Sequence, residues 1–375
     1  MGQAEAEVKI GFTADFHIHP YRLCSRDGGH DRLLDGLLCL RQSLDLARSA
    51  RAAWVNCGDF KMPKTSWPQE ALTGSHEILR KYPDVDKLFV AGNHDATGLG
   101  GSGLAPFRDC AQVVESAAEY VRVKDSSGLA VTLLCVPWDA ALDSLSPRGD
   151  VPVVAHGFLA GSMLGPEDLR IAKGTSVEAY GSFPFAVFGD VHKGQWRRPP
   201  DPALGSPATW FPYFSKPPVR KPGAWSGEVF YTGSPYQQSW GERNDPPKGG
   251  LLVDTDTGAV SLEPFLSPRF VHLEISTVAD LELFLKNRGD YSGDFVRVVY
   301  SGPGSSVVGA AEHLGDSFRS YQFIVRRPPA QRSDSRADVH AGMGMDEILA
   351  GYVAANPLPD ADPAVVLEAG RRLVR

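Results

Sequence analysis

Short apolar runs that end in polar residues alternate with helical stretches over the first two thirds of the chain. Residues 31–51 carry leucines that keep largely to one face of a helix. Runs rich in β-branched or aromatic residues and bounded by Gly, Pro or Asp indicate buried strands. Such runs occur at 8–17, 52–59, 87–95, 130–139, 151–157, 185–192 and 228–235. Strands that alternate with helices predict an α/β fold, in which ligands collect at the carboxyl ends of the strands.

The later part of the chain has a different pattern. A Pro-rich stretch at 195–227, with interleaved basic and aromatic residues, shows no period and is predicted to be a long loop. Residues 268–327 then read as strand, helix, strand, helix, strand, which predicts a compact second unit after a core at 1–267. We expect a flexible linker at 328–341 and a pair of helices at 342–375. Asp362 is the predicted N-cap of the last helix, with Pro363 at its first position.

Composition and charge narrow the class of protein. A chain of 375 residues with 42% hydrophobic and 22% charged residues is typical of a globular protein with a sizeable core. No apolar run approaches the roughly 20 residues of a membrane span, and the N-terminus lacks the basic region of a signal peptide, so we expect a cytoplasmic protein. The five cysteines lack a C-x-x-C pair, which favours reduced core thiols. The net charge of −7 argues against nucleic-acid binding over the whole surface but allows a local basic patch.

Acidic, amide and imidazole side chains follow the ends of several predicted strands. Each one alone has an ordinary explanation, such as a turn, a cap or a hydrogen-bonded core histidine, but their occurrence at successive strand ends indicates a metal site. Oxygen and imidazole ligands without thiolates suit Mn²⁺, Fe²⁺ or Zn²⁺. Two such ions roughly 3.5–4 Å apart can clamp a phosphoryl group and lower the pKa of a water molecule to about 7. The candidate ligands are Asp15, His17, Asp59, Asn93, His156, Asp190 and His192, with Asp59 the candidate to bridge two ions.

These strand ends carry a family resemblance. The segments Asp15-x-His17, Gly58-Asp59, "GNHD" at 92–95, His156-Gly157 and Gly189-Asp190-x-His192 resemble the five motifs of calcineurin-like metallophosphoesterases. "AHGFLAGS" and "YTGSPYQQSWGE", followed by "KGGLLVD", are similar to the SbcD branch, the bacterial and phage counterpart of the eukaryotic meiotic-recombination nuclease. The resemblance covers most of residues 8–327. It implies a four-layer sandwich of two mixed β-sheets flanked by helices, with a small α+β capping domain and a C-terminal helical pair.

The resemblance also implies roles for the site residues. One ion would be held by Asp15, His17, Asp59 and His192, and the other by Asp59, Asn93, His156 and Asp190, with Mn²⁺ the expected metal. His94 would be the general acid that protonates the leaving oxygen, with Asp95 orienting its ring. The departure is Asp190, because the family pattern has histidine there. "DFHIHP" alone is also compatible with the His-x-His of amidohydrolase or polymerase-and-histidinol-phosphatase sites, but those sites do not bring "GNHD" and the later strand ends.

Two further segments suggest macromolecular partners. The Pro-rich stretch combines phosphate-attracting charge with aromatic surfaces, which suits DNA binding, although its tryptophans could equally pack on the core. The C-terminal helices present an apolar stripe that needs a partner, either their own core or, by the resemblance, the coiled-coil base of an SbcC-like SMC-family ATPase. The DNA-binding candidates are Trp196, Arg197, Arg198, Lys216, Arg220 and Lys221, and the partner-binding candidates are Met345, Ile348, Leu349, Tyr352 and Val353.

The sequence and the resemblance together indicate the nuclease subunit of an SbcC-SbcD type repair or recombination complex. We expect a Mn²⁺-dependent phosphodiesterase with double-strand exonuclease and single-strand endonuclease activity, acting as a homodimer within a heterotetramer. One alternative is a phosphoesterase that acts on nucleotides or other small phosphoesters. A second is a catalytically weak scaffold that bridges DNA to an ATPase, which the aspartate at position 190 makes conceivable.

Overall fold

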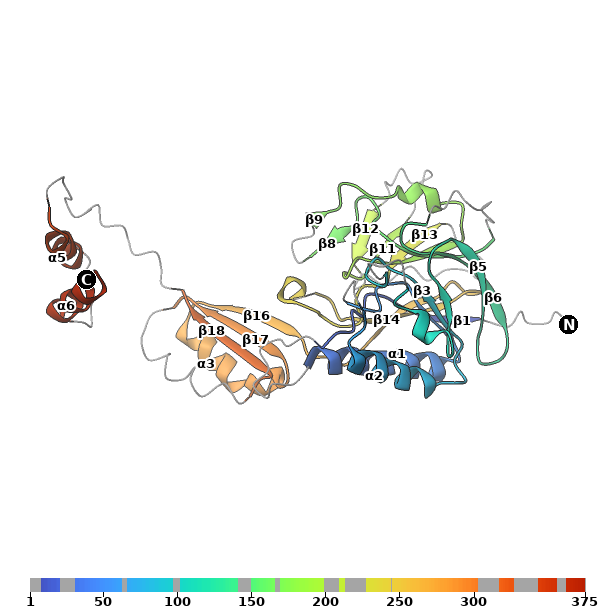
Figure 1. The fold of residues 1–375 in the computed structure, drawn as a ribbon, viewed down its shortest axis with the longest axis horizontal. Helices are drawn as coiled ribbons and strands as arrows, with labels where there is room; N and C mark the ends of the chain where they lie inside the picture. The colour runs from blue at the N-terminus through green and yellow to red at the C-terminus, as the bar shows by residue number, and fades with distance from the viewer. Residues whose placement is uncertain are drawn as a thin grey trace.

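The computed structural model describes residues 8–20, 31–62, 66–96, 102–140, 150–165, 169–198, 209–212, 227–243, 245–302, 317–326, 343–355 and 362–374. In its larger part, on the right of the view in Figure 1, two mixed β-sheets pack against each other. The first sheet has the order β15-β14-β1-β2-β3-β4, in which β1 to β4 run parallel and β14 and β15 antiparallel to their neighbours. Its strands are β1 (Lys9–Thr13), β2 (Ala53–Asn56), β3 (Lys87–Val90), β4 (Gln112–Val114), β14 (Gly249–Asp254) and β15 (Val260–Pro264).

The second sheet has the order β12-β11-β13-β10-β7-β6-β5. Its four central strands are parallel and are buried on both faces, which explains their continuous apolar runs in the sequence. The Pro-rich stretch expected to be a loop supplies the antiparallel strands β11 and β12, with Trp196 opposite Phe211, so that expectation was wrong for these two segments. The strands are β5 (Glu119–Lys124), β6 (Ala130–Val136), β7 (Val153–His156), β10 (Phe185–Gly189), β11 (Gln195–Arg198), β12 (Thr209–Pro212) and β13 (Glu228–Tyr231).

Further layers cover the outer faces of the two sheets. Helices α1 (Asp31–Ala50) and α2 (Gln69–Arg80) cover the first sheet, and their leucines pack on Trp54 and Phe89. The 3₁₀ turn η3 (Val177–Tyr180) and the hairpin of β8 (Met163–Leu164) and β9 (Leu169–Arg170) cover the second. The α/β sandwich of mixed sheets is therefore confirmed. The described cover of the second sheet is a turn and a hairpin, where flanking helices had been expected.

A small separate sheet follows the sandwich. Its parallel strands β16 (Phe270–Ile275), β17 (Phe295–Tyr300) and β18 (Ser320–Val325) pack with α3 (Val278–Lys286) around their own apolar core. The unit docks on the sandwich, because Arg319 pairs with Asp35 of α1 at 2.8 Å and the amide of Phe270 donates to Gln237. The second helix expected in this unit falls almost entirely outside the described residues.

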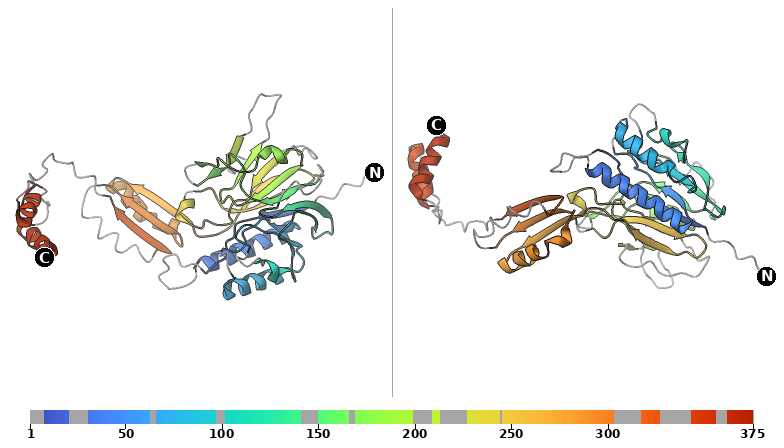
Figure 2. Two further views of the ribbon diagram at one scale, coloured as in Figure 1. Left: turned by 45° about the horizontal axis from the view of Figure 1, so that its top comes forward. Right: turned by 90° about the horizontal axis from the view of Figure 1, so that it is seen from below.

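The chain ends in a helical pair, α5 (Met345–Ala355) and α6 (Pro363–Val374), which pack on each other (Figure 2). Asp362 caps α6 as predicted, since its carboxylate accepts from the amide of Ala364 at 2.9 Å. Gly370 permits the close approach, because a Cβ there would lie 2.9 Å from Leu349. Among the described helices, none has the length and apolarity to cross a bilayer.

Candidate metal centre

The candidate ligands converge where the two sheets present the carboxyl ends of their parallel strands. Strands β1, β2 and β3 of the first sheet precede Asp15, His17, Asp59 and Asn93, whereas β7 and β10 of the second lead to His156, Asp190 and His192. Five of them, together with His94, form overlapping groups of three, and within each group the ligand atoms lie within 4.8 Å of one another. The three groups at this edge are Asp15 with His17 and His192, His17 with Asp59 and His94, and Asp15 with Asp59 and His156.

The backbone at these positions adopts an uncommon conformation. Six described residues other than glycine have positive φ, and four of them are candidate ligands: Asp15 (56°), His17 (46°), Asp59 (53°) and Asp190 (90°). Such conformations cost about 1–3 kcal/mol each and cluster at functional sites. Hydrogen bonds between the strand-end loops hold them, from the Asp15 amide to Gly58 (2.9 Å) and from the His17 amide to Asp59 (3.0 Å). The turns aim the side chains at one another.

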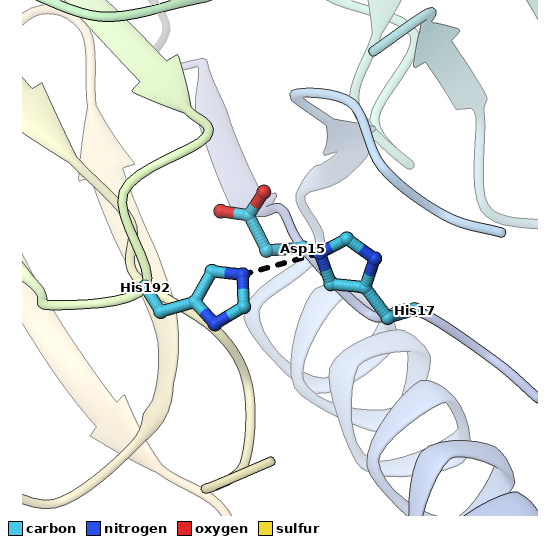
Figure 3. Close-up of side chains that lie close together, drawn as sticks. All are labelled: Asp15, His17 and His192. Atoms are coloured by element: carbon cyan, nitrogen blue, oxygen red, sulfur yellow. Dashed lines mark hydrogen bonds between the residues drawn. The ribbon is translucent and has the colours of Figure 1, made fainter. Parts of the chain in front are cut away.

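The first set of ligands joins the two sheets through facing imidazoles (Figure 3). The Nε2 atoms of His17 and His192 lie 3.1 Å apart, and the Oδ2 atom of Asp59 lies 3.6 Å from His17 Nε2. The amide of Asp190 donates to both carboxylate oxygens of Asp15, at 3.0 and 3.1 Å. The Asp15 carboxylate is therefore fixed to the loop after β10 that also carries His192.

A buried charge network orients His192. Its Nδ1 lies 2.9 Å from Glu242, whose carboxylate also binds Lys248 Nζ and Ser234 Oγ, each at 3.0 Å. A carboxylate can only accept, so Nδ1 carries a proton, and Nε2 is the nitrogen that faces His17 and can ligate once its own proton has left. Lys248 additionally donates to the carbonyl of His192 at 2.6 Å. This network determines which nitrogen of His192 is available to a metal.

The second set of ligands surrounds His156. Its Nδ1 lies 2.8 Å from the carbonyl of Cys57 and so donates, which leaves Nε2 facing the carboxylates, 3.4 Å from Asp59 Oδ1 and 3.8 Å from Asp190 Oδ1. The two oxygens of Asp59 thus face different histidines, Oδ2 toward His17 and Oδ1 toward His156. Gly58 allows this approach, because its φ is +103° and a Cβ there would lie 2.1 Å from His156 Nδ1.

Burial and mutual charge shift the pKa values of these groups. Burial raises the pKa of the Asp15 carboxyl to about 7 and lowers that of His17 to about 3, so His17 is neutral. Burial opposes the charged form of His156 and His192 as well, but Asp59 raises the pKa of His156 to about 10 and Glu242 raises that of His192 to about 9. Burial also disfavours the charged form of Asp59, yet His156 and His17 hold its pKa well below the usual range.

The residues present fit divalent cations. The buried Asn93 Oδ1 and Asp190 Oδ2 have no hydrogen-bond partner among the described residues, and His156 Nε2 has none of good alignment. Buried polar atoms of this kind ordinarily have a partner, which a cation would supply. Two nitrogens bound to one ion at about 2.1 Å would lie roughly 3.0–3.4 Å apart, which matches the facing atoms of His17 and His192. The donors are nitrogen and oxygen, as the sequence indicated.

His94 and Asp95 lie beside the ligands with contacts that differ from the expected pair. Nδ1 of His94 is 2.5 Å from the carbonyl of Met62, which orients the ring, and the His94 ring centroid is 4.8 Å from that of His17. The buried Asp95 instead accepts from the amides of Gly92 (2.9 Å) and Lys61 (3.0 Å). Asp95 therefore shapes the loop that carries His94, and the expected contact with the ring is replaced by the Met62 carbonyl.

Of the described DNA-binding candidates, Trp196 lies in the core. Its side chain is 4% exposed and stacks on Phe211. Arg197 pairs with Glu178 at 3.0 Å. The expectation that Trp196 offers a stacking surface is therefore wrong, because a tryptophan in a sheet buried on both faces has no free ring face. Arg198 lies in β11, and Lys216, Arg220 and Lys221 lie outside the described residues.

The partner-binding candidates all lie on α5. Met345 and Tyr352 are exposed, at 59% and 62%, whereas Ile348, Leu349 and Val353 are half-buried. Part of the stripe is covered by α6, as the contact of Leu349 with Gly370 shows.

Several site residues carried no assigned role in the sequence. Glu242, Ser234 and Gln238, which donates to the carbonyl of Asp15, all belong to the "YTGSPYQQSWGE" segment after β13. The signal was available, since β13 is the parallel neighbour of β10 and polar residues follow its carboxyl end. Met62 contributes only its carbonyl, which no side-chain pattern reveals.

Comparisons with known proteins add a likeness in fold. No family model matches the chain, and no curated protein matches it. Among solved structures, a metallophosphoesterase from Sphaerobacter thermophilus is 13% identical, with 76% of this chain and 95% of that chain covered and a TM-score of 0.30. A 5'-nucleotidase precursor from Thermus thermophilus is 16% identical, with 70% of this chain but 55% of that chain covered and a TM-score of 0.37. The function of this chain is therefore inferred from its own site.

Proposed function

We propose that the protein is a two-metal phosphoester hydrolase. The observation that carries the proposal is the position of Asp59, whose two carboxylate oxygens face His17 and His156 in adjoining ligand sets. The first ion would be held by Asp15, His17, Asp59 and His192, and the second by Asp59, Asn93, His156 and Asp190. Divalent ions at these positions would supply Lewis-acid activation of water and positive charge for the phosphoryl oxygens.

The chain's own groups complete the chemistry. His94 donates from Nδ1 to the carbonyl of Met62, so in its imidazolium form Nε2 carries a second proton. A half-exposed imidazole beside the ligands can pass that proton to the leaving oxygen, which makes His94 the general acid. Glu242 and the carbonyl of Cys57 keep the Nε2 lone pairs of His192 and His156 directed at the site.

The test is hydrolysis of a generic phosphodiester, bis(p-nitrophenyl) phosphate, by metal-depleted protein with and without added Mn²⁺. We expect activity only with metal, and its loss in Asp59→Asn. Asp84→Asn, which changes a surface carboxylate paired with Arg48, is the matched control and should be as active as the wild type. Equal activity of Asp59→Asn and the wild type in Mn²⁺ would refute the bridging role.

We further propose that the natural substrate is DNA, cut as by an SbcD-type nuclease with Mn²⁺. The proposal rests on the sequence resemblance of the "YTGSPYQQSWGE" segment, and its structural support is that this segment both buttresses the site and anchors the small sheet. Glu242 accepts from the His192 ring, and Ser234 donates to Glu242. On the other side of the segment, Gln237 accepts from the amide of Phe270 at the start of β16. End-labelled duplex DNA in Mn²⁺ or Mg²⁺, with a nucleoside monophosphate in parallel, is the test. Cleavage of the nucleotide alone would instead favour a small-phosphoester enzyme.

A partner for the C-terminal helices is proposed on the same basis. Met345 and Tyr352 leave apolar surface exposed on α5, which fits the coiled-coil base of an SMC-family ATPase such as SbcC. Deletion of 342–375 should leave Mn²⁺-dependent hydrolysis intact and abolish association with such an ATPase. Unchanged association would place the interface elsewhere.

A further inference from the structure

A cleft of about 450 Å³ lies beside the metal centre and includes the candidate ligand His156 in its lining. The volume is that of a small-molecule site, for which about 300–1,000 Å³ is usual. Its lining also contains Trp138, Phe158, Asp139 and Lys173. None of these four has a role in the metal centre, so the cleft is an additional feature next to it.

The rings in the cleft are arranged edge to face. Trp138 lies 6.0 Å from the His156 ring at 70° and 6.4 Å from the Phe158 ring at 88°. Trp138 is half-buried, and Phe158 is 39% exposed although it is a large apolar side chain. In neither contact are the rings stacked in parallel, the arrangement by which a planar base binds an aromatic side chain.

The backbone that carries these rings is tied to the loops of the metal centre. The amide of Trp138 donates to the carbonyl of Ala91 at 2.9 Å, directly before the "GNHD" segment. The Tyr231 hydroxyl donates to Gly157 (2.9 Å) and accepts from Leu159 (2.8 Å), so it clamps both sides of Phe158. The backbone of both residues is therefore tied to the loops of the metal centre before any substrate binds.

The charged groups of the cleft match a nucleotide. Lys173 is exposed and is a cation for a phosphate, whereas the exposed Asp139 is an acceptor for an exocyclic amino group of a base. We propose that this cleft binds one unpaired nucleobase of the substrate, flat on one of the two perpendicular rings of Trp138 and Phe158 and edge-on to the other, with its phosphate between Lys173 and the metal centre. The inference rests on the proposed phosphoester hydrolysis. A base inside a duplex has no free face, so the base must be terminal, single-stranded or extruded.

The test separates base binding from hydrolysis. Metal-depleted protein is titrated calorimetrically with deoxyadenosine 5'-monophosphate and, in parallel, with deoxyribose 5-phosphate, which lacks the base. Stacking contributions to one base predict an affinity loss of about 5- to 150-fold for deoxyadenosine monophosphate in Phe158→Ala and in Trp138→Leu. Binding of the sugar phosphate should be unchanged in both variants. Lys173→Met should weaken the binding of both compounds, because both carry the phosphate.

Two control variants complete the experiment. Leu266→Ala removes an apolar side chain that is 82% exposed and lies outside the cleft lining, and Lys286→Met removes a lysine of α3. Neither should change the binding of either compound. Equal affinity of the wild type for both compounds, or unchanged nucleotide affinity in Phe158→Ala, would overturn the base site. Because metal is absent, this result is independent of whether the protein hydrolyses phosphoesters.

Discussion

The Nε2 atoms of His17 and His192 lie 3.1 Å apart although 175 positions separate the two residues in the sequence. His17 follows a strand of the first sheet and His192 a strand of the second, so the contact joins the two halves of the sandwich. Two lone pairs that face each other at this distance repel, and either a proton or a cation between them removes the repulsion. Protons and metal ions therefore compete for this place.

Metal binding is expected to release protons near neutral pH. In the metal-free protein Glu242 raises the pKa of His192 to about 9 against the effect of burial, and Asp59 does the same for His156, to about 10. An imidazolium cannot ligate, so its proton must leave, and the affinity for Mn²⁺ should rise between pH 6.5 and 9. Calorimetric titration in buffers of different ionisation enthalpy measures the release. An affinity independent of pH over this range would contradict the protonated state of both histidines.

The same raised pKa has the opposite effect on the stability of the metal-free protein. The ordinary pKa of histidine, 6.5, applies to the unfolded chain, so the His192 imidazolium stabilises the folded state fully below pH 6.5. That contribution is lost as the pH rises to about 9. In urea unfolding with a chelator present, the free energy of unfolding should therefore decline over this pH interval. Glu242→Gln should make that decline smaller.

Glu242→Gln is expected to lower the metal affinity by about 10- to 100-fold, as for other residues that orient a ligating histidine. An amide can still contact Nδ1, but the negative charge that balances His192 and Lys248 is lost. Glu178→Gln is the matched control, since Glu178 is a surface carboxylate paired with Arg197. Metal affinity measured by equilibrium dialysis should distinguish the two. If both variants bind metal equally well, the network has no part in the centre.

Asp190→Ala should remove the second ion and most of the hydrolysis, whereas Asp190→His should retain both. The Asp190 carboxylate lies 3.8 Å from His156 Nε2, and its Oδ2 has no partner among the described residues. Its amide donates to Asp15 in either variant, so the loop geometry is kept. Metal content by atomic spectroscopy and turnover are measured together. Two bound ions and normal turnover in Asp190→Ala would make position 190 a bystander.

His94→Ala should retain both ions and lose hydrolysis by about 10²- to 10⁴-fold, because only a general acid is removed. The result is informative because the His94 ring also falls in a group with His17 and Asp59 that could hold a metal. The control is His76→Ala, which removes a histidine that pairs with Asp109 outside the candidate metal centre. This variant should have the same turnover as the wild type. Loss of metal along with activity would reassign His94 as a ligand.

Gly58→Ala should disrupt the centre, and Gly128→Ala should not. Both glycines have positive φ, +103° and +86°, so both variants incur backbone strain of about 1–3 kcal/mol. A Cβ at 58 would lie 2.1 Å from His156 Nδ1, whereas nothing lies within 4 Å of a Cβ at 128. We expect similar loss of stability from strain and loss of metal binding only in Gly58→Ala. Retained metal binding there would show that the loop shifts without displacing His156.

The sequence by itself determined most of the buried parallel strands, the first helix and the kinds of side chain that follow the strand ends. Apolar runs bounded by Gly, Pro and Asp located β1, β2, β3, β7, β10 and β13, because strands buried on both faces need no polar alternation. The same runs identified which carboxylates and imidazoles follow a strand end. The hydrophobic spacing of α1 and the Asp-Pro start of α6 were also local properties, and the structure agrees with both.

Tertiary structure alone decided how those residues act together. The orientation of His192 depends on Glu242, that of His94 on the Met62 carbonyl, and the approach of His156 on the absence of a side chain at Gly58. The Pro-rich stretch looked like a loop because its strands are short and lie at a sheet edge, where pairing partners and not local propensity fix the conformation. Trp196 is buried because this pairing places its strand inside the second sheet. Contacts between residues distant in sequence carry no local signal, so only the packed sandwich could reveal them.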